Sequence, residues 1–323
     1  MTTPHSNQKK AAKEIIMAFK KTHYVMLMAQ MQSGKTLTSL KVAKDIPNIR
    51  SVYIISGDNS FDLSKQWSTD THDYKDPSKK YTVCFRNYLD IIPRDTVDSI
   101  FIWDESHTAQ SMGQTMEKFY KRININVSNV EFEMNSRNIY ILSVSATPLS
   151  ELSCNVNEAQ SKQIVILDTP KEYRGVKYYH ENNHLYSSFH PSDTDALSVF
   201  LEKYNTLEKY VIIRARSSKL FNALETIKPI AEKKNYLVLT CNSTKESNLK
   251  NFDILSTKPR QPTLIIISGK CRMGQRINKT YLAATFEYSL SMKSDTALQG
   301  LLGRCCGYHT SNVDIHIPNH IIY

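Results

Sequence analysis

The sequence predicts an α/β protein made of two domains, each with a parallel sheet covered by helices. Apolar runs of strand length alternate with helical segments, one run is followed by a tight loop and a helix, and another ends on two adjacent carboxylates. Strands that alternate with helices at this spacing pair in parallel. The runs in the first half lie at residues 24–28, 51–55, 81–85, 100–103, 139–144 and 164–167. Those in the second half lie at residues 210–213, 236–240, 264–267 and 282–286.

Helices are predicted between these strands. An amphipathic helix spans residues 9–21, ahead of the first apolar run, and further helices are predicted at residues 193–207 and 220–233. The segment 124–137 has no clear period, and we interpret it as an insertion. The sequence has no internal repeat and no glycine-serine linker.

The domain boundary is predicted near residues 168–186. There Asp168, Thr169 and Pro170 follow an apolar run and break the alternation. A chain of 323 residues has room for about two domains, each able to bury its own core. We therefore expect a first domain at residues 1–170 and a second at residues 171–323.

The tight loop after the first apolar run has the composition of a phosphate-binding loop. It reads Ala29-Gln30-Met31-Gln32-Ser33-Gly34-Lys35-Thr36. A strand, a loop and a helix in this order surround a triphosphate with backbone N–H groups at the positive end of the helix dipole. We expect Lys35 to contact the β and γ phosphates of ATP and Thr36 to ligate Mg²⁺. The loop departs from the strict motif at Ala29 and Gln32, where glycine is common.

The apolar run at residues 100–103 is followed by Asp104 and Glu105, which places two carboxylates at the carboxyl end of a predicted strand. Open parallel sheets bind ligands at that edge. Asp104 is suited to hold Mg²⁺, directly or through water, and Glu105 is suited to orient and deprotonate an attacking water. Taken alone, an Asp-Glu pair after a strand is more often solvated. After a phosphate loop, the interpretation as a nucleotide site is favoured.

A third motif, Ser143-Val144-Ser145-Ala146-Thr147-Pro148, follows the apolar run at residues 139–142. Together with the phosphate loop and the Asp104-Glu105-Ser106-His107 box, it makes the chain resemble the first motor domain of superfamily 2 DExH-box helicases and translocases. The resemblance implies two tandem RecA-like domains with ATP bound in the cleft between them. It also implies that Ser145 and Thr147 couple the state of the nucleotide to the nucleic-acid site.

Further motifs of this family are matched elsewhere. Gln8 matches the glutamine with which many such enzymes contact adenine. Residues 263–274 resemble the fifth helicase motif, and residues 297–308 resemble the sixth. In the sixth, Arg304 matches the arginine finger that reaches the γ phosphate. Gln299 lies one residue farther from this arginine than usual, and Gly307 stands in place of a second arginine.

The resemblance implies an ATP hydrolase that uses ATP and Mg²⁺ to unwind, or to move along, DNA or RNA. Three alternatives remain open: a duplex translocase or annealing ATPase that does not separate strands, a nucleic-acid-binding regulator with weak ATPase activity, and a phosphate-loop metabolic kinase. A metabolic kinase would need neither the Ser-Ala-Thr segment nor a basic second domain. Small motors of this form occur in phages and large viruses, so the resemblance suggests such an origin.

Charge is distributed unevenly between the two halves. Residues 1–168 contain 20 Lys and Arg against 18 Asp and Glu, and the remaining residues contain 21 against 13. A basic second domain is suited to a phosphate backbone, although scattered solvated lysines give the same balance. Trp67 is a candidate for stacking on a base, but an ordinary core or surface tryptophan is the commoner case. The candidate nucleic-acid contacts are Arg214, Arg216, Arg272, Arg276 and Lys279.

The six cysteines are scattered, apart from the adjacent Cys305 and Cys306, and form no Cys-x-x-Cys motif. We therefore expect reduced thiols and no zinc site. No apolar run approaches the roughly 20 residues of a membrane span, and the polar N-terminus lacks a secretory signal. The sequence thus predicts an intracellular protein without membrane contact. Its expected partners are DNA or RNA and, by the resemblance, other proteins of replication, repair or transcription.

Overall fold

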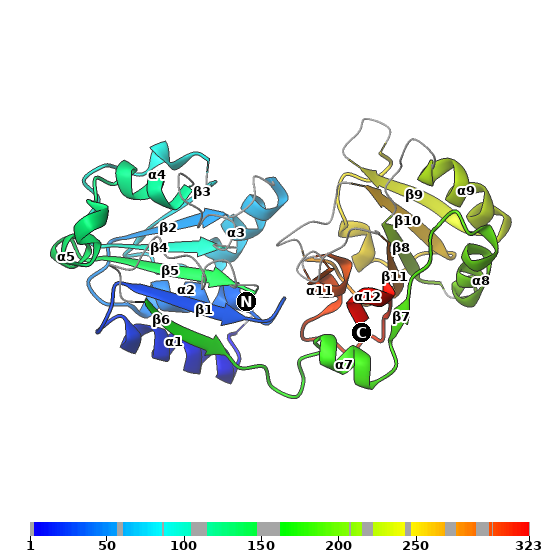
Figure 1. The fold of residues 1–323 in the computed structure, drawn as a ribbon, viewed down its shortest axis with the longest axis horizontal. Coiled ribbons are helices and arrows are strands. Elements are labelled where there is room, and N and C mark those ends of the chain that lie inside the picture. Colours follow the sequence, from blue (N-terminus) through cyan, green and yellow to red (C-terminus); the bar gives the residue numbers. More distant parts are fainter. Residues whose placement is uncertain are drawn as a thin grey trace. The chain divides into compact units, whose positions relative to one another are not determined.

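The computed structural model divides the chain into two compact units, Met1–Pro170 and Lys171–Tyr323. Each unit contains its own parallel sheet flanked by helices (Figure 1). The structure describes residues 3–56, 61–85, 87–104, 115–146, 162–206, 208–214, 222–242, 247–268, 276–288, 297–298 and 300–322.

Six strands form the sheet of the first unit, in the order β3-β2-β4-β5-β1-β6. All neighbouring pairs in this sheet are parallel. The central strands are buried almost throughout, as expected for a sheet covered on both faces. The strands are β1 (Tyr24–Ala29), β2 (Ser51–Ser56), β3 (Lys80–Phe85), β4 (Ser99–Asp104), β5 (Ile139–Ser145) and β6 (Lys162–Leu167).

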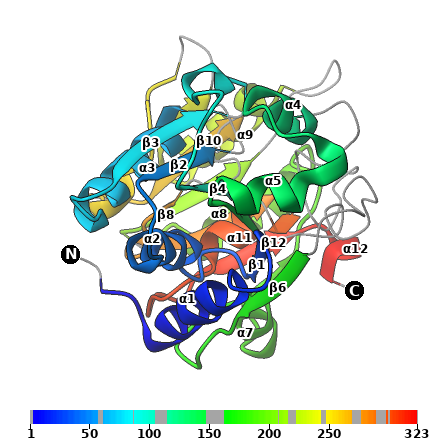
Figure 2. The same ribbon diagram turned by 90° about the vertical axis from the view of Figure 1, so that its left-hand side faces the viewer.

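In the described part of the first unit, three helices cover one face of this sheet. Figure 2 shows α1 and α2 side by side on that face. Ile15 of α1, Leu40 of α2 and Trp67 of α3 belong to one core with alternate strand residues, among them Ile102. Successive strand residues point to opposite faces, so the intervening residues are left for a second core. The helices are α1 (Ser6–Ala18), α2 (Lys35–Asp45) and α3 (Phe61–Tyr74).

The opposite face is covered by α4 (Thr115–Arg122) and α5 (Val130–Ser136). There Phe119 and Met134 are fully buried in a core that includes Phe101 of β4. The segment 124–137, interpreted from the sequence as an insertion, contains α5 and therefore contributes to this core. Its periodicity is hard to recognise because α5 is only seven residues long.

Two long cationic side chains bind backbone carbonyls at the amino edge of the first sheet. Lys79 Nζ donates to the carbonyl oxygens of residues 43, 44 and 46 at the end of α2, over 2.7–2.9 Å. Arg137 donates through Nη1 to the carbonyl of Ile123 and through Nη2 to that of Thr96, both over 2.7 Å. These contacts satisfy carbonyl groups that the helix end and the loops leave without backbone partners.

The second unit contains another six-stranded sheet, in the order β7-β12-β11-β8-β10-β9. Its neighbouring strands are also parallel. The strands are β7 (Leu185–Ser187), β8 (Tyr210–Arg214), β9 (Leu237–Asn242), β10 (Thr263–Ser268), β11 (Leu282–Glu287) and β12 (Asp314–Ile317).

Helices α8 and α9 cover one face of the second sheet. Phe200 of α8 and Ile227 of α9 lie in a core with Ile213 and Phe286. Helix α11 lies on the other face, where Thr285 Oγ1 and Cys305 Sγ are 3.6 Å apart. The helices of this unit are α7 (Val176–Glu181), α8 (Thr194–Tyr204), α9 (Ala223–Lys233), α11 (Leu301–Cys305) and α12 (Asn319–Ile322).

The prediction of two parallel-sheet α/β domains is confirmed. Two strands of the second sheet, β7 and β12, were absent from the sequence-based assignment. β7 has three residues, and β12 reads Asp-Ile-His-Ile, so neither forms a continuous apolar run. Both strands acquire their partners only through the fold, since β12 lies between β7 and β11.

Candidate active site

Three of the sequence motifs meet at the carboxyl edge of the first sheet. β4, β5 and β1 are neighbours, and the register pairs Asp104 with Val144 and Met28 with Ser145. Asp104, Ser145 and the start of the phosphate loop therefore lie at the ends of three adjacent strands. With neighbouring strands about 4.8 Å apart, β4 lies roughly 10 Å from β1, so that one bound nucleotide can contact both strand ends.

The phosphate loop has the backbone shape of an anion site. Gln32 (φ 55°) and Gly34 (φ 98°) both have positive φ values, and Ser33 lies between them. Left-handed residues in such turns make concave nests of N–H groups that bind anions. Helix α2 begins directly afterwards, with Gly34 as its N-cap, so the positive end of its dipole lies at the loop. Ser33 Oγ also donates to the carbonyl of Gln30 over 2.7 Å, which closes the turn.

This backbone explains why glycine is common at the two left-handed positions. A residue with a side chain pays roughly 1–2 kcal/mol for the left-handed conformation. Gly34 avoids that strain, whereas Gln32 adopts it. The loop therefore has the left-handed backbone that the motif requires, although Gln32 occupies a position at which glycine is common.

Gln8 of α1 contacts the phosphate loop directly. Its side chain is 1% exposed; Nε2 donates to the carbonyl of Ser33 over 3.1 Å, and Oε1 accepts from the N–H of His5 over 2.9 Å. A Cβ atom on Gly34 would lie 1.9 Å from Nε2 of Gln8. The glutamine thus fills the space that the missing side chain of Gly34 leaves open. Its contact with adenine stays a prediction.

Asp104 receives a hydrogen bond from a tryptophan of α3. Trp67 Nε1 donates to Asp104 Oδ2 over 3.1 Å, and the two residues are 2% and 6% exposed. Trp67 belongs to the core beneath α1, α2 and α3. Of the two common cases, core and surface, Trp67 is therefore a core residue, and stacking of Trp67 on a base is wrong.

The carboxyl edge of the second sheet contains a buried ion pair. Arg214 ends β8, Glu287 ends β11, and the register pairs them. Arg214 Nη1 lies 2.6 Å from Glu287 Oε1, and Glu287 Oε2 accepts from the N–H of Leu301, at the start of α11, over 2.8 Å. Burial raises the pKa of Glu287, and the charge of Arg214 opposes this shift. Arg214 is thus ion-paired within its own unit, and its contact with nucleic acid stays a prediction.

Arg304, the expected finger, is 1% exposed on α11. Lys279 lies close enough to interact with it: the pKa of Lys279 is lowered to about 8, mainly by burial, with the charges of Arg304 and Arg276 contributing and Cys305 and Cys306 opposing the shift. Burial also raises the pKa of the neighbouring Cys306 thiol to about 11. A buried guanidinium must move outward before it can contact a phosphate. The role of Arg304 at the γ phosphate therefore stays a prediction.

Four of the expected site residues, Glu105, Thr147, Arg216 and Arg272, lie outside the described residues, as does Gln299. Within the described ranges, no three His, Cys, Asp or Glu side chains are grouped so that they could hold a metal ion. No helix in the described part of the chain is long and apolar enough to cross a membrane. The described cysteines, Cys84, Cys241, Cys305 and Cys306, are all buried.

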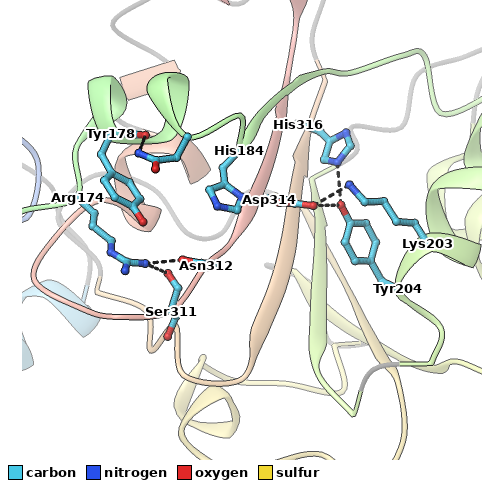
Figure 3. Close-up of polar contacts among 10 residues, drawn as sticks. Arg174, Tyr178, His184, Lys203, Tyr204, Ser311, Asn312, Asp314 and His316 are labelled. Carbon is cyan, nitrogen blue, oxygen red and sulfur yellow. Dashed lines mark hydrogen bonds and ion pairs between the residues drawn. The ribbon is translucent and has the colours of Figure 1, made fainter.

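A separate polar cluster lies at the amino edge of the second sheet (Figure 3). Asp314, the first residue of β12, accepts from Tyr204 OH (2.7 Å) and Lys203 Nζ (2.8 Å) and contacts His184 Nδ1 (2.9 Å). Burial opposes ionisation of Asp314, but these hydrogen bonds outweigh it and lower its pKa. Strands in a parallel sheet bind ligands at their carboxyl ends, so we interpret this cluster as a structural tie between β12, β7 and α8.

The sequence analysis did not identify the partner of Asp104 in the first unit or that of Arg214 in the second. Trp67 lies 37 residues before Asp104, and no motif links the two. Glu287 follows the apolar run at residues 282–286, and a carboxylate directly after a buried strand is the one signal that could have identified it. Its partners Arg214 and Leu301 come together only in the folded sheet.

The comparisons with known proteins show the fold. No family model matches the chain. An uncharacterized protein of Acanthamoeba polyphaga mimivirus is 25% identical over 338 residues, which covers 93% of this chain and 81% of that protein.

Two solved helicase structures match almost the whole chain. The Escherichia coli DEAH/RHA helicase HrpB aligns with a TM-score of 0.60 and 12% identity over 96% of this chain and 42% of its own. S. cerevisiae Dbp5, bound to RNA and ADP BeF3, aligns with a TM-score of 0.61 and 14% identity over 98% of this chain and 84% of its own. This chain therefore has the tandem RecA-like fold of these helicases, and it spans about two fifths of the length of HrpB.

Proposed function

We propose that this chain is a DExH-type ATPase that hydrolyses ATP with Mg²⁺ while it is bound to DNA or RNA, and that it couples hydrolysis to strand separation. The main observation behind this proposal is that the phosphate loop, Asp104 and Ser145 lie at the ends of three adjacent strands. The fold shared with HrpB and with RNA-bound Dbp5 supports the nucleic-acid partner.

The residues of the first unit fit a Mg²⁺-nucleotide. Mg²⁺ prefers hard oxygen ligands, and Thr36 and Asp104 offer a hydroxyl and a carboxylate at the same sheet edge. When bound, the ion neutralises charge on the β and γ phosphates. Lys35, the first residue of α2, adds a positive charge beside the loop.

Hydrolysis needs a base and a group that stabilises the transition state. In this proposal Glu105 accepts the proton of the water that attacks the γ phosphorus. The bond from that phosphorus to the β–γ bridging oxygen breaks, and ADP leaves with the electron pair. Arg304 is proposed to stabilise the charge on the transferred group. Ser145 and Thr147 are proposed to couple this step to the nucleic-acid site.

The second unit is proposed to hold the phosphate backbone. Residues 169–323 have 21 Lys and Arg against 13 Asp and Glu, and the proposed contacts are Arg214, Arg216 and Arg272. Each phosphate neutralised should contribute a slope of about −0.7 to −0.9 to log K against log salt. Binding that does not depend on salt would favour a metabolic kinase instead.

Steady-state ATP turnover tests the proposal. We expect stimulation by at least one of single-stranded DNA, duplex DNA and RNA, measured separately on the full chain. Lys35→Ala should lower turnover about 10²- to 10³-fold, because the phosphates lose the cation of the loop. Lys41→Ala is the matched control, since Lys41 lies on the same helix but pairs with Asp45. Equal turnover in the parent and in Lys35→Ala would refute the phosphate-loop assignment.

The two carboxylates should behave differently. Glu105→Gln should keep Mg²⁺-dependent nucleotide binding and lose turnover, because the amide is not a base. Asp104→Asn should weaken Mg²⁺-dependent binding itself. A strand-displacement assay with a partial duplex then separates unwinding from translocation on duplex DNA without strand separation.

A regulator that binds nucleic acid and turns over ATP poorly is the second candidate. The burial of Arg304 favours it, because a buried guanidinium has to become exposed before it can contact a phosphate. Salt-dependent nucleic-acid binding together with ATP turnover that is equally slow with and without nucleic acid would favour this candidate.

A further inference from the structure

We infer that Trp67 is a positioning residue that fixes the metal-binding carboxylate of Asp104, an inference that rests on the proposed function. Trp67 Nε1 and Asp104 Oδ2 are 3.1 Å apart in a buried setting. The tryptophan comes from α3, which bears none of the motif residues described above. It therefore adds a residue to the nucleotide site that the motifs do not include.

The chemistry of the indole makes this contact directional. An indole N–H only donates, so the partner oxygen must accept, and the ring cannot reverse that role. The carboxylate of Asp104 can rotate about its side-chain bonds unless a neighbour holds one oxygen. Outer partners that orient a ligating carboxylate change metal affinity by about 10- to 100-fold when they are removed.

The indole itself is held by packing. Trp67 is 2% exposed and shares a core with Ile54 of β2 and Ile102 of β4. Because β4 also ends at Asp104, donor and acceptor are fixed to the same part of the sheet. The position of Oδ2 is therefore set by the core beneath α3 as well as by the backbone of β4.

The chain provides a matched control in its other tryptophan. Trp103 precedes Asp104 on β4 and is fully buried in the opposite core, where its ring contacts Phe119. Its Nε1 has no hydrogen-bond partner among the described residues. Trp103→Phe therefore removes an indole of similar burial from the residue next to Asp104 in the chain without removing a hydrogen bond to the carboxylate.

The experiment compares Trp67→Phe with Trp103→Phe in the full chain. Affinity for a non-hydrolysable ATP analogue is measured by calorimetry, once with Mg²⁺ and once with EDTA, and thermal unfolding confirms that both variants are folded. We expect Trp67→Phe to weaken Mg²⁺-dependent affinity about 10-fold or more, with affinity in EDTA unchanged. Trp103→Phe should match the parent in both conditions.

Three outcomes would count against the inference. If Trp67→Phe matches Trp103→Phe while the parent binds Mg²⁺ and nucleotide, the positioning role is wrong and the proposed function stands. If Trp67→Phe loses affinity equally in EDTA, its effect is general packing. If the loss is the same in an Asp104→Asn background, the two residues are not coupled. A parent that binds no Mg²⁺-nucleotide refutes the proposed function instead.

A second measurement tests the inference if the Trp67→Phe variant does not fold. In Trp103→Phe the remaining indole is Trp67, because the chain has 2 tryptophans. Mg²⁺ binding at Asp104 should change the electric field at that indole and shift its fluorescence emission. Emission that is the same with nucleotide alone and with Mg²⁺-nucleotide would overturn the inference.

Discussion

Replacing Gly34 by alanine should destabilise the first unit through Gln8. A Cβ atom at this position would lie 1.9 Å from Nε2 and 2.7 Å from Cδ of Gln8, so the glutamine must leave its site. It would then lose its bonds to the carbonyl of Ser33 and the N–H of His5. The new alanine would also have to adopt the φ of 98° now held by glycine.

The size of this effect follows from the two contributions. Alanine in the left-handed region costs about 1–2 kcal/mol. The two lost hydrogen bonds cost about 0.5–1.5 kcal/mol each, and so about 1–3 kcal/mol together. We therefore expect Gly34→Ala to lower the free energy of unfolding by about 2–5 kcal/mol, and Gln8→Ala alone by about 1–3 kcal/mol.

The double variant gives the sharper test. Once Gln8 is shortened, the three atoms nearest to the new Cβ are gone, and only the backbone strain is added. The double variant should then be about as stable as Gly34→Ala, with a coupling of about 1–3 kcal/mol between the two sites. The measurement is urea unfolding followed by tryptophan fluorescence. Both tryptophans, Trp67 and Trp103, lie in the first unit, so this signal reports on that unit.

Additive costs would refute this reasoning. If the double variant loses the full sum of the two single losses, Gln8 and Gly34 do not compete for the same space. If Gly34→Ala is as stable as the parent, the left-handed backbone conformation assigned to residue 34 is wrong.

Three further predictions concern other parts of the chain. Arg137→Lys should lower the urea stability of the first unit by about 1–3 kcal/mol, because a single ammonium cannot reach the carbonyls of both Thr96 and Ile123; an unchanged midpoint would contradict it. Burial lowers the pKa of His316 to about 4, so the folded second unit disfavours the protonated histidine. The unit should keep its full stability above pH 6.5 and lose up to about 3 kcal/mol as the pH falls from 6.5 to 4. His316→Phe should flatten this loss when amide hydrogen exchange of β12 is followed between pH 6.5 and 4, and an equal slope in both proteins would argue against the histidine. Arg304→Ala should keep ATP affinity within a few fold and cut hydrolysis about 10³- to 10⁵-fold; normal hydrolysis in this variant, with loss in Arg272→Ala, would show that the sixth motif is wrongly aligned.

Much of the fold could be predicted because buried parallel strands leave continuous apolar runs in the sequence. β4 and β10 are examples, since nearly every residue in them is buried on one face or the other. β12 could not be found in this way. Its histidine, His316, is buried by stacking on Tyr186 and Phe286, and those contacts join residues far apart in the chain.

In the candidate site, too, some features could be predicted from the sequence and others could not. The loop of residues 29–36 could be located because its backbone shape depends on residues adjacent in sequence. Arg304 was matched by its motif, but its burial depends on the sheet and helix that surround it. The same holds for Arg214, whose pairing with Glu287 is set by the register of β8 and β11. A motif thus indicates which residue types are present, and tertiary packing decides which of them face a ligand.

The order of strands in the second sheet has a consequence for the synthesis of the protein. β7 is the first strand of its unit along the chain and an edge strand of the sheet, and its neighbour is β12. About 130 residues separate the two strands, which corresponds to roughly 6–26 s of translation at 5–20 residues per second. During that interval β7 has emerged from the ribosome without its partner, whereas the sheet of the first unit is complete once β6 ends at Leu167. A nascent chain halted before Asp314 should therefore hold a folded first unit and a second unit that proteases can still cut at β7.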